Sequence, residues 1–464
     1  MSRLSWAPRA DALSTAVLAH RAAAHGHAIR VTSDGYAGPA SLAAAARALG
    51  LQAASLPAAQ ADAGKSIMPP RIVLYCGAAI GYPYYAYYSH CLWSLGLPYR
   101  RASAADIAGG ILDGADLLIL PGGFATWGLD RAENAEGVDD AIRAFLARGG
   151  AGIGSCGGAY YFSQGRPHWL GLLDAKPRYT HEYLYTGAGL LNVRLDDPAL
   201  RRDLPETLEL AYYHGPVYES AQRRARACGS FESHIMSTRL FIDNPLDADR
   251  FGAIMQDRVA VLAGDAPGGR VVGFSPHPEM GEFLRKAMAL DGYVRKYLPI
   301  RGRKTMDETL RFYAKEDCLS FRLVLNAALM LGAFDAPGRG GAASVAASQA
   351  PPRLDLQRMN QAWRPAVDSL ASRLSHEEPE LSDLMGGMLD ALRAEWESLV
   401  AAVQDWPDEA LADELGYVLE DAVLALEAPP RRAVEMLVLL ELPVRLLAAA
   451  ARIARVDRVV KESM

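Results

Sequence analysis

The sequence predicts an α/β protein with a doubly wound parallel sheet, followed by a C-terminal all-α helical bundle. Between residues 70 and 334, short apolar runs alternate with stretches of helical periodicity, which is typical of a parallel sheet covered on both faces. Beyond residue 352 the apolar residues recur only at helical spacing, as they do in the helices of a bundle. A chain of 464 residues has room for both units.

Five apolar runs mark the clearest strands of the α/β region. They lie at 72–76, 116–120, 152–155, 259–263 and 271–274. Apolar residues at helical spacing predict a helix over 138–147 and a longer helical pattern over 307–331.

The remaining segments flank this region. One third of residues 1–66 are alanine, and this segment of unknown role is expected to hold a short helix at 42–51 and a linker at 53–65. We interpret its histidines as exposed helix-end residues rather than metal ligands. They are His20, His25 and His27.

A second linker and the bundle follow the α/β region. Residues 336–352 contain proline, glycine and small residues without apolar periodicity, which indicates a linker. Residues 353–464 predict four helices, the last kinked at Pro443, and we expect this bundle to fold on its own.

Composition excludes several classes of function. The net charge of −6 comes from the bundle, because residues 351–464 carry 21 acidic and 12 basic side chains. The rest of the chain carries 33 acidic and 36 basic side chains. No dense basic face predicts nucleic-acid binding, and no apolar run predicts a membrane span or a secretory signal. Five scattered cysteines indicate reduced thiols. We therefore expect a soluble, unprocessed, cytoplasmic protein without metal or cofactor.

The strongest local motif surrounds Cys156. The strand at 152–155 runs into Gly154-Ser-Cys-Gly-Gly, and a helix-compatible segment follows. Glycines relieve crowding at such a strained elbow, and a helix N-terminus favours a thiolate. The alternative is a buried cysteine in an ordinary turn.

A second motif ends the strand at 116–120 with Pro121-Gly122-Gly123-Phe124. Loops at the carboxyl edge of a parallel sheet gather ligands. Backbone amides there could hold an oxyanion, with the amide of Gly157 as a second donor.

The third motif is Ser275-Pro-His277-Pro-Glu279, directly after the strand at 271–274. In an extended segment the side chains of His277 and Glu279 share a face, and Pro278 favours extension of the residue before it. A base oriented by an acid is what a cysteine nucleophile requires.

These motifs, in this order, resemble class I glutamine amidotransferase domains. The runs Leu120-Pro-Gly-Gly-Phe and Cys156-Gly-Gly-Ala-Tyr-Tyr-Phe, with Gly149-Gly150, are most similar to the amidotransferase-like N-terminal domain of biotin-protein ligases. Over residues 70–282 the resemblance implies a flavodoxin-like sheet, a triad of Cys156, His277 and Glu279, and oxyanion amides at Gly123 and Gly157. Neither a ligase catalytic domain nor a synthetase domain is recognisable in the rest of the chain.

Further residues are candidates for substrate binding. Gly122, Phe124 and Tyr160 belong to the motifs, Tyr82 opens a run of tyrosines after the first strand, and His214 ends a plausible strand. The alternatives are helix packing for the tyrosines and a core position for His214.

Three functions fit these observations. The first is an amidotransferase-like hydrolase or acyl transferase, acting on a small-molecule or peptide amide through a Cys156 thioester. The second is a catalytically silent ligand-binding or scaffold protein whose bundle recruits a protein partner. The third is a glutaminase subunit that serves a separate synthetase chain docked at the bundle.

Overall fold

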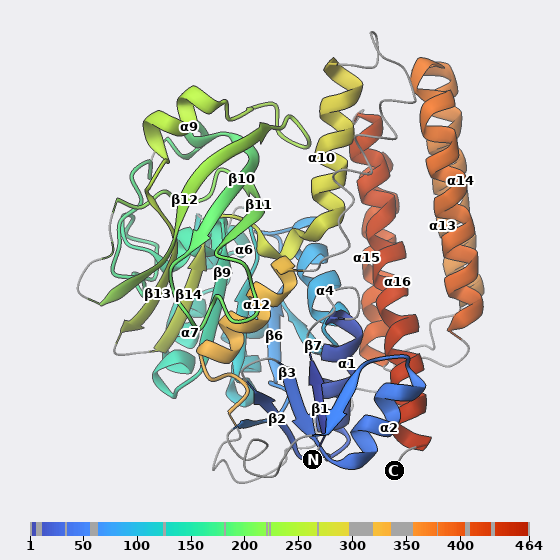
Figure 1. Ribbon diagram of the computed structural model, residues 1–464. Helices are drawn as coiled ribbons and strands as arrows, with labels where there is room; N and C mark the ends of the chain where they lie inside the picture. Colours follow the sequence, from blue (N-terminus) through green and yellow to red (C-terminus); the bar gives the residue numbers. More distant parts are fainter. Residues whose placement is uncertain are drawn as a thin grey trace.

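The computed structural model describes most of the chain in three packed parts (Figure 1). The described residues are 2–5, 12–32, 35–55, 64–123, 127–180, 182–219, 221, 224–266, 269–296, 319–335, 356–377, 379–403, 409–427 and 432–462. The predicted linker at 336–352 lies outside them. So does the first half of the helical pattern at 307–331, whose second half forms α12 (Leu319–Met330).

The N-terminal part is a small antiparallel sheet with two helices, α1 (Ala12–Ala24) and α2 (Ala40–Ala48). Its strands pair in the order β4-β1-β3-β2-β5. They are β1 (Ser2–Ser5), β2 (Ile29–Thr32), β3 (Gly35–Gly38), β4 (Ala53–Ser55) and β5 (Lys65–Ile67).

Two expectations for this part were wrong in detail. Both ends of the predicted linker at 53–65 are strands, because β4 and β5 complete the two edges of the small sheet. His20, which lies within α1, is buried rather than exposed, and its Nδ1 contacts the carbonyl oxygen of Leu95 at 2.6 Å.

The second part contains a nine-stranded mixed sheet, and the predicted α/β class is confirmed. Five parallel strands run in the order β7-β6-β8-β9-β14, which is the flavodoxin-like order 2-1-3-4-5. They are β6 (Ile72–Tyr75), β7 (Tyr99–Ala102), β8 (Leu117–Leu120), β9 (Ala151–Ser155) and β14 (Gly269–Phe274). Four of the five predicted strand runs are present among them.

An antiparallel extension, which the sequence did not predict, continues the sheet from β14. It pairs in the order β11-β10-β12-β13, so the predicted strand at 259–263 runs antiparallel to β14. The strands are β10 (Ala188–Leu195), β11 (Thr207–Tyr213), β12 (Ala225–Ser237) and β13 (Val259–Ala266).

Short helices connect these strands. Helix α4 lies between β6 and the bundle (Figure 1), and it also packs against the turn η5 that follows β14. The α-helices are α4 (Tyr84–Ser94), α5 (Ala104–Ala108), α6 (Leu129–Glu133), α7 (Val138–Ala147), α8 (Gly157–Phe162), α9 (Ala248–Ile254) and α10 (Gly281–Lys296). The 3-10 turns are η2 (Ile111–Gly114), η4 (Tyr183–Thr186) and η5 (Pro278–Met280).

The predicted C-terminal bundle is present. Its helices are α13 (Leu356–Glu377), α14 (Pro379–Ala402), α15 (Glu409–Glu427) and α16 (Ala433–Glu462), and α16 continues through Pro443. The indole rings of Trp363 and Trp396 stack at 4.6 Å in its interior. None of the helices within the described ranges is long and apolar enough to cross a membrane.

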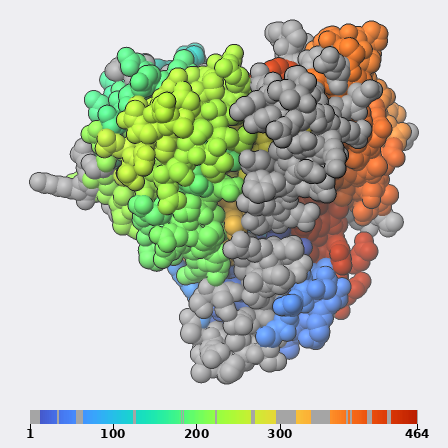
Figure 2. Space-filling model, turned by 45° about the horizontal axis from the view of Figure 1, so that its top comes forward, coloured from blue at the N-terminus to red at the C-terminus, as the bar shows by residue number. Residues whose placement is uncertain are grey.

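The bundle packs directly against the other two parts of the molecule. Helix α16 packs against α1 and α4, and Arg21 of α1 forms a buried pair with Asp457 of α16. Figure 2 shows the green residues of the α/β part on one side and the orange residues of the bundle on the other. The apolar stripes predicted a bundle, but they did not reveal that α16 has further faces in contact with the other parts.

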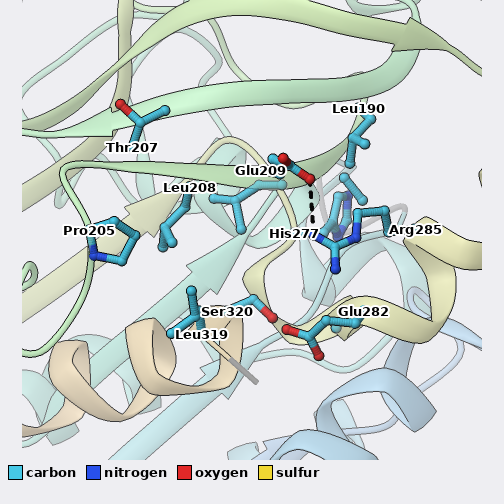
Figure 3. A pocket seen from close by; sticks show the side chains of 13 residues that line it. Leu190, Pro205, Thr207, Leu208, Glu209, His277, Glu282, Arg285, Leu319 and Ser320 are labelled. Atoms are coloured by element: carbon cyan, nitrogen blue, oxygen red, sulfur yellow. Dashed lines mark hydrogen bonds and ion pairs between the residues drawn. The ribbon is translucent and has the colours of Figure 1, made fainter. Parts of the chain in front are cut away.

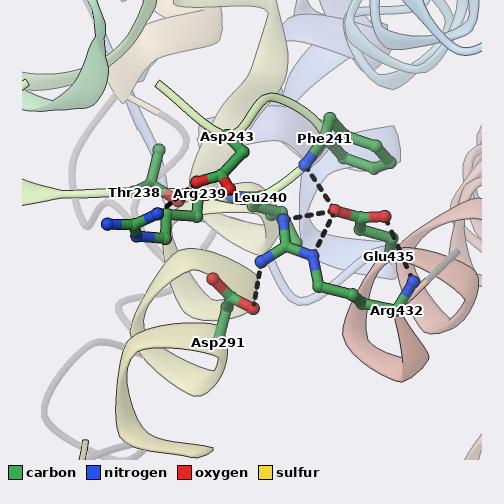
Figure 4. A network of polar contacts seen from close by, with 8 residues as sticks. All are labelled: Thr238, Arg239, Leu240, Phe241, Asp243, Asp291, Arg432 and Glu435. Atoms are coloured by element: carbon green, nitrogen blue, oxygen red, sulfur yellow. Dashed lines mark hydrogen bonds and ion pairs between the residues drawn. The ribbon is translucent and has the colours of Figure 1, made fainter. Parts of the chain in front are cut away.

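A polar network joins the start of α16 to the α/β part (Figure 4). Arg432 contacts the carboxylate of Asp291 on α10 at 3.4 Å and that of Glu435 at 2.8 Å. Glu435 also accepts a hydrogen bond from the backbone amide of Phe241 at 2.8 Å. Charged side chains from two segments and a backbone amide from a third therefore fix this end of the bundle.

Candidate active site

The three sequence motifs meet because they end adjacent parallel strands. The segment 121–123 follows β8, Cys156 follows β9, and His277 follows β14. The carboxyl ends of parallel strands lie at one edge of the sheet, where ligands of such folds bind. The strand order thus converts three distant segments into one site.

Cys156 occupies a strained turn between β9 and α8. Its φ of 48° and ψ of −104° are uncommon for a residue with a side chain. Its amide donates to the carbonyl oxygen of Phe274 at 2.8 Å, and its thiol donates to the carbonyl oxygen of Tyr213 at 3.0 Å. The residue as a whole is 8% exposed, so Cys156 is buried.

The loop after β8 lies directly against this turn. A Cβ atom at Gly157 would collide with the carbonyl oxygen of Gly123, and one at Gly122 would lie 2.5 Å from Cε1 of His277. Only glycine permits this approach. Gly122 and Gly123 thus lie beside the turn that holds Cys156 and beside the imidazole of His277, whereas Phe124 lies outside the described residues.

His277 and Glu279 form a buried pair. Nδ1 of His277 contacts Oε1 of Glu279 at 2.7 Å, and the two side chains are each 1% exposed. The amide of His277 donates to the carbonyl oxygen of Ala211 at 2.8 Å, which fixes the segment against β11. Nε2 of His277 is buried, and the part of the chain that the structure describes offers it no hydrogen-bond partner.

The electrostatic environment strongly favours a second proton on this imidazole. Burial lowers the pKa of His277, but the Glu279 carboxylate and the Cys156 thiol outweigh that effect and raise the pKa to about 10. A group with such proton affinity, next to a thiol, suits proton transfer from sulfur to nitrogen.

Two hydroxyl groups that the sequence analysis did not assign to the site extend the pair. Ser155 donates a hydrogen bond to Oε2 of Glu279 at 2.9 Å, and Tyr88 contacts the Ser155 hydroxyl at 2.6 Å. Ser155 directly precedes Cys156 in the sequence, so its place near the site could have been predicted. Tyr88 is one of several tyrosines in a run, and nothing in the sequence distinguishes it, because its contact depends on how α4 packs on the sheet.

The other predicted substrate residues have structural partners. Tyr160 is buried and donates to the carbonyl oxygen of Gly215 at 3.3 Å. Tyr82 donates to the carbonyl oxygen of Leu439 in α16 at 2.6 Å, so its hydroxyl contacts the bundle.

His214 lies close to the pair. Nε2 of His214 contacts the side-chain amide of Asn244 at 2.9 Å. Burial, with Arg250 and His277, lowers the pKa of His214 to about 4. It is therefore a neutral imidazole at the edge of the site.

A cavity of about 200 Å³ adjoins the imidazole between β11, α10 and the start of α12 (Figure 3). Its wall includes His277 and the polar side chains of Glu209, Glu282, Arg285 and Ser320, and Arg285 donates to Glu209 at 2.9 Å. The described part of the chain contains no group of three His, Cys, Asp or Glu side chains that could hold a metal ion.

Comparison with protein families gives one match. Residues 98–195 match the model of the CobB/CobQ-like glutamine amidotransferase domain. That stretch includes Gly122, Gly123 and Cys156 but ends before His277 and Glu279. The chain therefore contains a glutamine amidotransferase-like domain. No curated protein matches the chain.

Solved structures similar to this chain include two glutamine amidotransferases and a putative GMP synthase subunit. A glutamine amidotransferase from Thermotoga maritima is 14% identical, with a TM-score of 0.34, over 57% of this chain and 98% of that one. A glutamine amidotransferase from Methylobacillus flagellatus is 12% identical, with a TM-score of 0.34, over 59% and 98%. A putative GMP synthase subunit from Thermoplasma acidophilum is 14% identical, with a TM-score of 0.29, over 55% and 98%. Similarities this low carry no conclusion about function.

Proposed function

We propose that the chain is a cysteine-dependent, amidotransferase-like enzyme that attacks an amide through Cys156 and forms a thioester. The observation that carries the proposal is the state of His277: its Nδ1 is held by buried Glu279, and its buried Nε2 has no hydrogen-bond partner among the described residues. The family match over residues 98–195 supports the same chemistry.

In the first half of the reaction, Nε2 of His277 takes the proton of the Cys156 thiol, and the sulfur attacks the carbonyl carbon of the amide. The carbonyl oxygen becomes an anion, for which the backbone amides of Gly123 and Gly157 are the proposed donors. His277 then gives its proton to the amide nitrogen. The C–N bond breaks, ammonia or an amine leaves, and an acyl thioester remains.

In the second half, a water molecule or an amine attacks the thioester while His277 takes its proton. The C–S bond breaks, and the thiolate recovers the proton from His277. The product is a carboxylic acid or a new amide. The part of Glu279 is to orient the imidazole and to stabilise the imidazolium.

The finer parts of this proposal rest on the sequence. They are a small-molecule or peptide amide as substrate, contacts from Gly122, Phe124, Tyr160, Tyr82 and His214, a cytoplasmic location and a protein partner at the bundle. The nearer likeness to the N-terminal domain of biotin-protein ligases rests on the run that begins at Cys156.

The proposal is tested by ammonia release from a panel of primary amides that includes L-glutamine. We expect release by the wild type and by Cys228→Ala, which changes a buried cysteine far along the sheet, and none by Cys156→Ala. Equal release by wild type and Cys156→Ala would contradict the proposal. Binding of an amide without turnover would support the silent scaffold instead.

A further inference from the structure

A buried hydroxyl chain leads from α4 to the carboxylate of Glu279. Tyr88 and Ser155 are both fully buried, and their contacts run from the Tyr88 hydroxyl to the Ser155 hydroxyl at 2.6 Å and on to Oε2 of Glu279 at 2.9 Å. The other carboxylate oxygen, Oε1, contacts His277. Each oxygen of Glu279 therefore has its own partner.

The direction of the hydrogen bonds follows from counting protons. A serine hydroxyl has one proton, and Ser155 uses it toward Glu279. The bond between Ser155 and Tyr88 must then be donated by Tyr88. Burial, followed by the charge of Glu279, raises the pKa of Tyr88 well above its ordinary value, so the phenol keeps its proton and remains a donor.

We propose that Tyr88 and Ser155 are positioning residues that hold the Glu279 carboxylate so that it can orient His277. This inference rests on the proposed function. A buried carboxylate that loses a donor becomes a stronger base, so without the hydroxyl chain Glu279 would compete with His277 for the proton on Nδ1. The imidazole would then be less able to take the proton of Cys156.

The same helix provides a matched control. Tyr87 is as buried as Tyr88, but its hydroxyl has no hydrogen-bond partner within the described ranges and its ring packs near Phe283. Tyr87→Phe and Tyr88→Phe therefore remove the same atom from the same helix, and only Tyr88→Phe breaks the chain to Glu279.

The test is the pH profile of Cys156 alkylation by iodoacetamide, measured on the full chain by intact mass and peptide mapping. A hydrogen bond to a charged group contributes enough that its loss should move the acid limb of the profile to higher pH by about one pH unit. We expect this shift for Ser155→Ala and a smaller one for Tyr88→Phe, with no shift for Tyr87→Phe. Because both hydroxyls act in one chain, the double variant should behave like Ser155→Ala alone.

Thermal melts separate positioning from folding, since a purely structural role would lower the melting temperature without moving the profile. Folded Ser155→Ala and Tyr88→Phe proteins with the wild-type profile would overturn the inference while leaving the triad intact, provided that His277→Ala changes the profile. If His277→Ala also keeps the wild-type profile, both the inference and the proposed function fail.

Discussion

The buried pair of His277 and Glu279 yields the most detailed prediction. Burial alone would lower the pKa of His277, and it is the Glu279 carboxylate, with the Cys156 thiol, that raises it to about 10. Glu279→Gln removes the strongest of the effects that raise the pKa of His277, so this pKa should fall, although Cys156 still raises it. His277→Ala removes the proton acceptor altogether.

The expected loss follows from the acidity of an unassisted thiol, which is about 3% ionised at pH 7. Alkylation of Cys156 at that pH should fall by up to about 30-fold in His277→Ala and by less in Glu279→Gln. With a turned-over substrate, acylation should fall by about a thousandfold or more in His277→Ala, as for an essential triad member.

The assay is the rate of iodoacetamide labelling between about pH 5 and 9, with circular dichroism melts to establish folding. His376→Ala, on the exposed surface of α13, is the control and should label like wild type. Folded His277→Ala protein that labels Cys156 at the wild-type rate across this range would refute the assignment of the base.

Three further predictions concern other groups. Cys156 should be alkylated before Cys76, although Cys76 is the more accessible of the two residues. The reason is that the loss of hydration around the Cys76 thiol, together with nearby Glu414, raises the pKa of Cys76 well above its ordinary value. Faster labelling of Cys76 in peptide maps would contradict the assignment of Cys156 as the nucleophile. Burial raises the pKa of Asp291 from 3.8 to about 6, although Arg432 acts in the opposite direction. The folded state therefore keeps the carboxyl proton of Asp291 to higher pH than the unfolded state does. As the pH rises from about 4 to above 6, the free energy of unfolding should fall by at most about 3 kcal/mol. Denaturant titrations should show a flatter dependence for Asp291→Asn, and an unchanged slope would contradict the prediction. Glu414→Gln should destabilise the protein by about 2 kcal/mol, because Glu414 is 3% exposed and pairs with the quarter-exposed Arg101. The control is Glu397→Gln, which should have almost no effect on stability, because Glu397 and Arg364 form an exposed pair.

The local parts of the site could be predicted from the sequence. The strands β8, β9 and β14 are short apolar runs, and each is followed at once by residues of unusual chemistry, such as the glycines around Cys156. Such signals lie within a few residues of one another. The rule that carboxyl ends of parallel strands share an edge then brings them together.

Features that depend on long-range packing could not be predicted in this way. Tyr88 reads as one tyrosine in a run of similar residues, and only the placement of α4 brings its hydroxyl to Ser155. The pairing of β10 with β12 and the contact of Tyr82 with α16 likewise join segments that do not follow one another in the chain. Periodicity indicates which residues are buried but not against which element they pack.

The formation of a thioester at Cys156 is tested most directly by rapid-quench intact mass spectrometry of the full chain mixed with an amide substrate. We expect a transient mass increase equal to the acyl group, which maps to the peptide that contains Cys156 and is absent from Cys156→Ala. Turnover of the same amide with an adduct on another residue, or with the same kinetics in Cys156→Ala, would contradict it.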